Sequence, residues 1–147
     1  MKKILMVSSL LIAFSCGEKK QSNPEKTLEE TQAETRDQLY QDVMDVHDEV
    51  MPRMGEINRL KRELEEKLSG LLAGDQSQNA ALIEKISQKI KDLEAAGNGM
   101  MVWMRQFDVL PDSLGHAKVM EGLEAEMVKI KKVKDDMLNA ISNAKEE

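Results

Sequence analysis

Aromatic residues, proline and glycine are scarce in this sequence, and their scarcity narrows the choice of fold. Aromatics make up 3% of the 147 residues, and the chain contains only 3 prolines and 8 glycines. A β-sandwich or barrel needs many β-branched and aromatic side chains and frequent turn residues. Charged residues, by contrast, reach 33%. This composition favours a single all-α domain built from long helices.

Positive charge is also in short supply. The chain has 21 basic residues against 27 acidic ones, for a formal charge of −6. Loss of Lys2 and Lys3 with an N-terminal signal would leave 19 against 27, or −8. This balance argues against nucleic acid as the main partner, because phosphate binding needs a cationic surface. It also argues against electrostatic attachment to anionic lipid.

The motifs of common active sites are missing. The sequence has no His-Glu-x-x-His zinc helix, phosphate loop, dinucleotide glycine motif or nucleophile elbow. A di-iron bundle needs Glu-x-x-His pairs, but Met44 stands three residues before His47 and no second pair occurs. His116, at the expected start of the last helix, is interpreted as solvent-exposed. We therefore predict a protein that is not an enzyme.

The N-terminus has the features of an export signal. Lys2 and Lys3 precede an apolar segment, residues 4–14, which is too short to span a bilayer as a resident helix. We therefore predict that residues 1–15 are a signal peptide.

Cysteine occurs only once, as Cys16, so no intramolecular disulfide can form. The run Ala13-Phe14-Ser15-Cys16 resembles the bacterial lipobox, whose cysteine is linked to diacylglycerol and becomes the first mature residue. Two or more acyl chains give stable anchoring. Gly17 after the cysteine, by resemblance to enteric lipoproteins, indicates the outer membrane, facing the periplasm or the cell surface. The alternative is an ordinary secretory signal with a chance cysteine.

After the cysteine, residues 16–26 are polar and contain Pro24, as is typical of a flexible tether. Thr27 and Glu30 have the spacing of a capping box, so we expect the bundle domain, residues 27–147, to begin there. Three apolar stripes with spacings of three and four follow, as in helices packed on partners. Their members are Leu39, Val43, Val46, Val50, Met54, Ile57, Leu60, Leu64, Leu68 and Leu71; Ile83, Ile86, Ile90, Leu93, Gly97, Met100, Met104 and Phe107; and Met120, Leu123, Met127, Ile130, Val133, Met137 and Ile141.

Turn residues separate the stripes. The first stripe keeps its phase across Pro52, which predicts a kink there rather than a break. Asp75 or Ser77 starts the second helix after the first turn, and Pro111 marks the second turn. Short connections make neighbouring helices antiparallel, so we predict an elongated, antiparallel up-down-up bundle of about three long helices. The pattern leaves open whether the second helix is continuous through Gly97–Gly99.

Methionines gather around one histidine and the single tryptophan. His47 is flanked by Met44, Met51 and Met54; Trp103 by Met100, Met101 and Met104; Met120 and Met127 lie on the third stripe. If the turns centre near residues 74 and 112, all three groups share one level of the bundle, with His47 facing Met101.

Thioether and imidazole groups suit Cu(I), and by analogy Ag(I), so one hypothesis is a soft-metal site. Its candidate ligands are His47, Met44, Met51, Met101 and Met104, with Met100 and Met120 as possible additions, Trp103 as a ring over the cation and Asp48 or Glu49 orienting the imidazole. The interpretation we favour is packing alone, since methionine fills irregular gaps beside a proline kink. A third possibility is a b-type haem held by His47 with Met101 or Met104.

The whole pattern resembles a known group. The motif Met44-x-x-His47-Asp48-x-x-Met51-Pro52-x-Met54, the later Met100-Met101-x-Trp103-Met104, the short lipoprotein signal and the tether are similar to small bacterial envelope lipoproteins that carry the automatic label "viral A-type inclusion protein". The resemblance implies an envelope location and no particular activity. The residues themselves leave two hypotheses for the function. One is sequestration or handover of Cu(I) or Ag(I), and the other is a tethered spacer that docks an unknown protein partner or self-associates.

Overall fold

The computed structural model describes residues 26–146. The predicted signal peptide, Cys16 and residues 17–25 of the tether lie outside this part. The described residues form four α-helices and one short 3-10 helix, without strands. The elements are α1 Leu28–Val50, α2 Arg53–Leu72, α3 Gln76–Gln106, η1 Asp112–Leu114 and α4 His116–Lys145.

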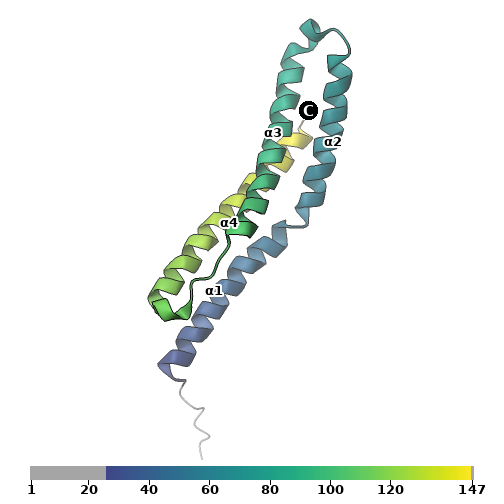
Figure 1. Cartoon of the computed structure of the whole chain (residues 1–147). Coiled ribbons are helices and arrows are strands. Elements are labelled where there is room, and N and C mark those ends of the chain that lie inside the picture. The colour runs from purple at the N-terminus through teal and green to yellow at the C-terminus, as the bar shows by residue number, and fades with distance from the viewer. Residues whose placement is uncertain (1–25, 147) are drawn as a thin grey trace, which may run out of the picture.

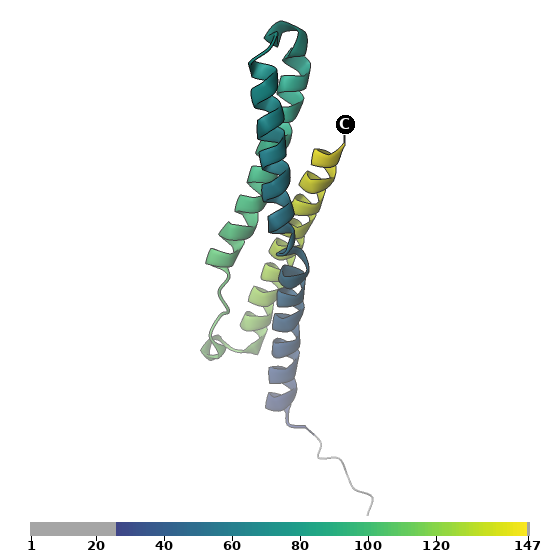
Figure 2. The same cartoon turned by 90° about the vertical axis from the view of Figure 1, so that its right-hand side faces the viewer.

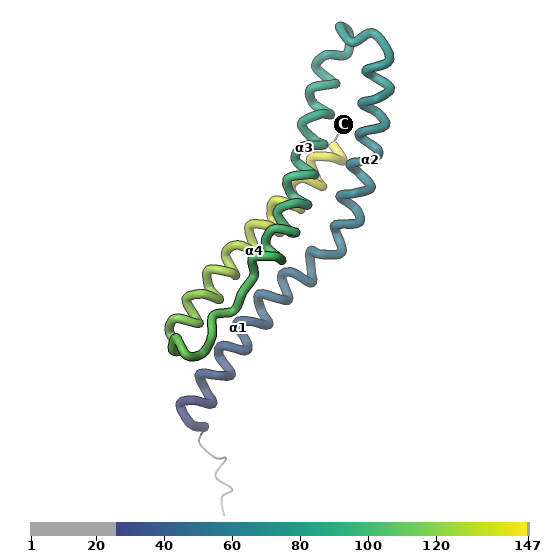
Figure 3. The backbone as a smooth tube through the Cα atoms, viewed as in Figure 1, coloured from purple at the N-terminus to yellow at the C-terminus, as the bar shows by residue number. Residues whose placement is uncertain are grey.

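The first arm of the bundle consists of α1 and α2, which are separated only by Met51 and Pro52. The chain bends at this joint, as the tube in Figure 3 shows. The sequence predicted a kink rather than a break, and the structure instead interrupts the helix for two residues at the bend. Proline lacks an N–H and disturbs the helical hydrogen-bond ladder. The Met51 N–H still donates to the His47 carbonyl at 2.8 Å, and the Met54 N–H donates to the Met51 carbonyl at 3.1 Å.

The helix starts follow the predicted capping residues. The Thr27 hydroxyl accepts a hydrogen bond from the Glu30 N–H, and the Glu30 carboxylate accepts one from the Thr27 N–H, which completes the capping box. Asp75 caps α3 by accepting bonds from the N–H groups of Ser77 and Gln78. Each such cap contributes about 1 kcal/mol. The α3 helix runs without interruption through Gly97–Gly99, which answers the question that the sequence left open.

The third arm is α4, which returns alongside α3 and parallel to α1. It packs on α1 and α3, and more briefly on α2. Figures 1 and 2 show three arms in an elongated arrangement. The predicted all-α, antiparallel up-down-up bundle is therefore confirmed, with a first arm made of two helices.

A continuous hydrophobic core joins the arms. Leu93 and Met100 of α3 and Ile130 and Met137 of α4 have no exposed surface, and neither does Val43 of α1. Full burial of such a side chain contributes about 1.5–3 kcal/mol. The apolar stripes read from the sequence thus face one another in the interior.

The core does not extend over the whole length of the rod. Lys145 at the end of α4 pairs with Glu56 at 2.7 Å, and Lys89 donates to the Glu146 carbonyl. Beyond this level the hairpin of α2 and α3 projects past the end of α4 (Figures 1 and 2). The thickest part of the bundle is therefore the half that contains α1, α4 and the second half of α3.

Candidate functional site

His47 lies on α1 at the centre of this thicker half. Its side chain is 13% exposed, and its Nδ1 is 2.8 Å from the Asp48 Oδ1. Of the two carboxylates expected to orient the imidazole, Asp48 makes the contact. Glu49 instead pairs with Lys134 of α4 at 2.5 Å.

The His47 ring is the end of a row of four rings that links α1 to α3. His47 lies 5.6 Å from Trp103, Trp103 lies 4.9 Å from Phe107, and Phe107 lies 6.0 Å from Tyr40, measured between ring centroids. All three pairs are tilted. Aromatic pairs at such distances contribute about 0.5–1.5 kcal/mol beyond the area they bury. The sequence register placed Met101 opposite His47, but Trp103 occupies that position.

Glu126 of α4 completes the cluster from the other side. Glu126 is only 9% exposed. Its carboxylate accepts a hydrogen bond from the Trp103 Nε1–H, with 3.0 Å between nitrogen and oxygen. Its other oxygen accepts one from the Lys129 Nζ at 2.7 Å. Glu126 was not among the residues predicted for the site, although its position carries a signal: it stands three residues after Leu123 and four before Ile130, on the core face of the helix.

The methionines divide among different surroundings. Met100 is completely buried, whereas Met101 is 39% and Met104 is 40% exposed. Met44 and Met51 are half-buried and pack against the core. The structure thus brings His47 and Trp103 together and separates fully buried from surface thioethers.

Three methionines line two separate surface grooves. Met54 and Met101 line a small groove of 110 Å³ between α2 and α3, next to Gly97. Met120 instead lines a groove between α1 and α4 together with Leu39. Within residues 26–146, no three His, Cys, Asp or Glu side chains form a group that could hold a metal ion. A set of thioethers with one imidazole is a different kind of ligand set.

The α1–α4 groove combines an apolar floor with acidic edges. Its volume is 540 Å³, and its lining consists of Glu34, Thr35, Gln38, Leu39, Asp42, Met120 and Glu124. Leu39 and Met120 are half-buried. The lining includes three carboxylates and no basic side chain, so the groove is suited to a ligand that is both apolar and cationic.

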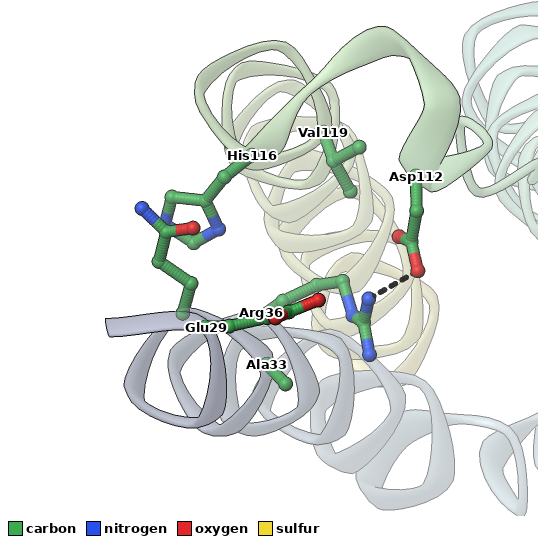
Figure 4. Close-up of a pocket in the computed structure, with 7 residues that line it drawn as sticks. Glu29, Ala33, Arg36, Asp112, His116 and Val119 are labelled. Atoms are coloured by element: carbon green, nitrogen blue, oxygen red, sulfur yellow. Dashed lines mark hydrogen bonds and ion pairs between the residues drawn. The ribbon is translucent and has the colours of Figure 1, made fainter. Parts of the chain in front are cut away.

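A second hollow lies at the end of the rod where α1 and α4 begin (Figure 4). It has a volume of 320 Å³, and its lining consists of Glu29, Gln32, Ala33, Arg36, Asp112, His116 and Val119. Arg36 reaches from α1 to Asp112 of η1, with 2.6 Å between Nη1 and Oδ2. Hydrogen bonds to Asp37 and then to Asp112 raise the pKa of Arg36 above its usual value. The Arg36–Asp112 ion pair joins α1 to η1 across this hollow. Because the lining carries charges of both signs, it does not select an anionic or a cationic ligand.

His116 in this hollow is half-buried, so the expectation that it is solvent-exposed was wrong. The reason is the return of α4 alongside α1, which brings the first turn of α4 against Glu29 and Arg36. Sequence periodicity does not report such a contact between two helix starts.

Within residues 26–146, no helix is both long enough and apolar enough to cross a bilayer. Comparisons with protein-family models, with curated proteins and with solved structures found no match to this chain.

Proposed function

We propose that this chain is a non-catalytic docking module, a helical rod held on the outer membrane by lipid on Cys16. The observation that carries the proposal is that the interior is filled while a surface groove is open. Met100 and Met137 have no exposed surface. Within residues 26–146, no buried side-chain polar atom lacks a hydrogen-bond partner. A filled and satisfied core leaves binding to the helix surfaces.

The tether supports the same function. The ten residues between Cys16 and Thr27, if fully extended, span at most about 35 Å. They join the rod at the start of α1, the end where η1 and the start of α4 also lie (Figure 1). A lipid on Cys16 would therefore hold the α1–α4 half near the membrane and the α2–α3 hairpin farther away.

The test is site-specific photo-crosslinking in cells that make the full-length chain. The reactive group is placed at Val128 of α4, which is 70% exposed, and at matched surface positions on α1, α2 and α3. A docking module gives a discrete adduct from one face, and Cys16→Ser, which removes the lipid attachment, abolishes it. Adducts from no face at all would overturn the proposal. An adduct of twice the chain's own mass would identify self-association as the docking event.

Cu(I) binding is a second candidate function, and the geometry of His47 favours it. Because the Asp48 carboxylate can only accept, the bond at 2.8 Å is made by an Nδ1–H donor, and the Nε2 lone pair of the neutral ring remains for a metal. The Trp103 ring lies 5.6 Å from the same ring at an interplanar angle of 30°, and an aromatic face can cover a soft cation.

Competition with a chromophoric Cu(I) chelator tests this candidate. A copper-binding chain removes about one equivalent of Cu(I) from the chelator. His47→Ala combined with Met51→Leu abolishes the transfer without loss of helicity, while His116→Ala, at the start of α4, leaves it intact. No transfer to the unsubstituted protein would refute copper binding and would leave the docking function standing.

A further inference from the structure

We propose that the groove between α1 and α4 binds a basic amphipathic helix of a partner protein. The inference rests on the proposed docking function and names the surface and the chemical class of the partner. It follows from the floor of the groove, from the charge of its edges and from the direction of the two helices that form it.

The floor and one edge are built from regular helix ridges. Two ridges of α1 line the groove, and in each of them the residues are four positions apart. The first ridge consists of Thr35 and Leu39, and the second consists of Glu34, Gln38 and Asp42. Residues at this spacing lie in one row on a helix surface. The α1 side therefore offers an inner row around Leu39 and an outer row that carries two carboxylates.

The α4 side continues the apolar surface beyond the groove itself. Met120, Glu124 and Val128 are spaced by four and lie on one ridge. Met120 is half-buried, whereas Val128 is 70% exposed. An exposed valine in line with the groove lengthens the apolar contact available to a ligand to about two helical turns.

The edges carry one sign of charge. Glu34 and Asp42 on α1 stand with Glu124 on α4, without a basic residue in the lining. In the adjoining hollow along α1, Asp37 pairs with Arg36 at 2.8 Å and Lys26 pairs with Glu34 at 2.5 Å. Asp42 on α1 and Glu124 on α4 therefore remain as the carboxylates of the lining without a paired cation among the described residues, one on each wall. A ligand with lysine or arginine beside its apolar face would supply their counter-charge.

Charge also decides between possible occupants. An anionic lipid headgroup or a nucleic acid would meet like charge at both edges of the groove. A second copy of this chain would bring a partner that is itself acidic, with a formal charge of −6. A cationic segment of a different protein is the occupant that complements the groove.

The direction of the walls favours a helical ligand. α1 and α4 run parallel and pack along their length, and Figures 1 and 2 show them side by side. A third helix can lay its ridge in such a groove at an interaxial distance of about 8–10 Å. An extended peptide would instead need an open sheet edge or an aromatic-lined groove. The described residues contain no strand, and the lining of this groove contains no aromatic residue.

The test uses the full-length protein in a non-ionic detergent and a synthetic leucine–lysine peptide of about five helical turns. The readout is the set of methionine methyl signals in an NMR spectrum of protein labelled with ¹³C at those methyl groups. We expect the Met120 signal to shift, while those of Met54 and Met101 in the α2–α3 groove stay in place. A peptide of the same length with glutamate in place of lysine is expected to bind at least about tenfold more weakly.

Charge-reversal variants separate a local site from the overall charge of the protein. Asp42→Lys with Glu124→Lys is expected to weaken the lysine peptide at least about tenfold. The control, Glu66→Lys with Glu84→Lys on the exposed hairpin, makes the same change in net charge and should alter affinity less than about twofold. If the groove variant loses helicity, the salt dependence of the unsubstituted protein takes its place. Raising NaCl from about 50 to 500 mM should weaken binding of the lysine peptide at least about tenfold.

Shifts of Met54 or Met101 in place of Met120 would overturn the assignment, as would equal effects of the two double variants. The same holds if the glutamate peptide binds as tightly as the lysine peptide or if neither binds. The in-cell crosslinking experiment then decides the wider question: adducts from another face leave the docking function intact, and adducts from none remove both proposals.

Discussion

Removal of the Glu126 carboxylate is the sharpest test of the cluster that joins the three arms. In Glu126→Ala the Trp103 N–H, on a residue only 5% exposed, loses the acceptor that now lies 3.0 Å away. A buried donor without a partner costs about 1–3 kcal/mol. The truncation also leaves a small void, so we expect the free energy of unfolding to fall by about 2–4 kcal/mol. In Glu126→Gln the amide oxygen still accepts the bond, and we expect a loss of about 1 kcal/mol or less.

Urea unfolding followed by circular dichroism measures both variants, and Trp103→Phe with the double variant completes a cycle. Because a hydrogen bond to a charged group contributes about 1.5–3 kcal/mol, the coupling energy between positions 103 and 126 should fall in that range. Circular dichroism is required because Trp103 is the only tryptophan and its fluorescence disappears in half of the cycle. Equal losses for Glu126→Gln and Glu126→Ala, or a coupling below about 0.5 kcal/mol, would refute the reasoning.

Two further predictions concern the helices. Gly99→Ala should raise the free energy of unfolding by about 1 kcal/mol, because Gly99 lies within α3 and the new methyl meets no atom within 4 Å. Gly122→Ala should raise the free energy of unfolding clearly less in the same urea assay, because its methyl would lie 3.0 Å from the Leu110 Cδ1. The pKa of Glu56 is held below its usual value of 4.5, chiefly by the hydrogen bond from Lys145. Its stabilising contribution is therefore present above pH 4.5 and lost as the pH falls through the lowered pKa. The protection factors of the amides in the last turn of α4, which are corrected for the slower intrinsic exchange at low pH, should fall on acidification. Glu56→Gln should show low protection factors there already at neutral pH.

The helices could be predicted because their signals are local. Thr27 and Asp75 mark helix starts through bonds to N–H groups only two or three residues away. The bend at Pro52 follows from one missing N–H, and the unbroken phase of the stripe across it indicates that both sides face the same core. Short connections then leave an antiparallel bundle as the simplest way to bury three stripes.

The sequence predicts the level along the bundle at which the candidate site lies, but not which face of each helix turns towards it. The turn centres placed Met101 opposite His47, whereas Trp103 is the residue in contact. Two residues amount to about 3 Å along a helix, which is a small error in height, but to about 200° around its axis, which turns the opposite face to the partner. Glu126 could not be predicted for the same reason. A carboxylate on the core face of a helix is explained only by its partner, the Trp103 Nε1–H, which the structure places beside it.

Burial also changes which thioethers are available for chemistry. Met100 and Met137 have no exposed surface, and withdrawing such a side chain from the core to reach a ligand would cost about 2–5 kcal/mol. Met44 and Met51 pack only partly on the core, and Met104 is 40% exposed, so these side chains can change rotamer at lower cost. A metal at His47 would therefore have to draw on the partly exposed methionines, whereas Met120 lies beside Leu39 in the acidic groove. Metal binding and peptide docking consequently engage different methionines of the same bundle, and each can fail without the other.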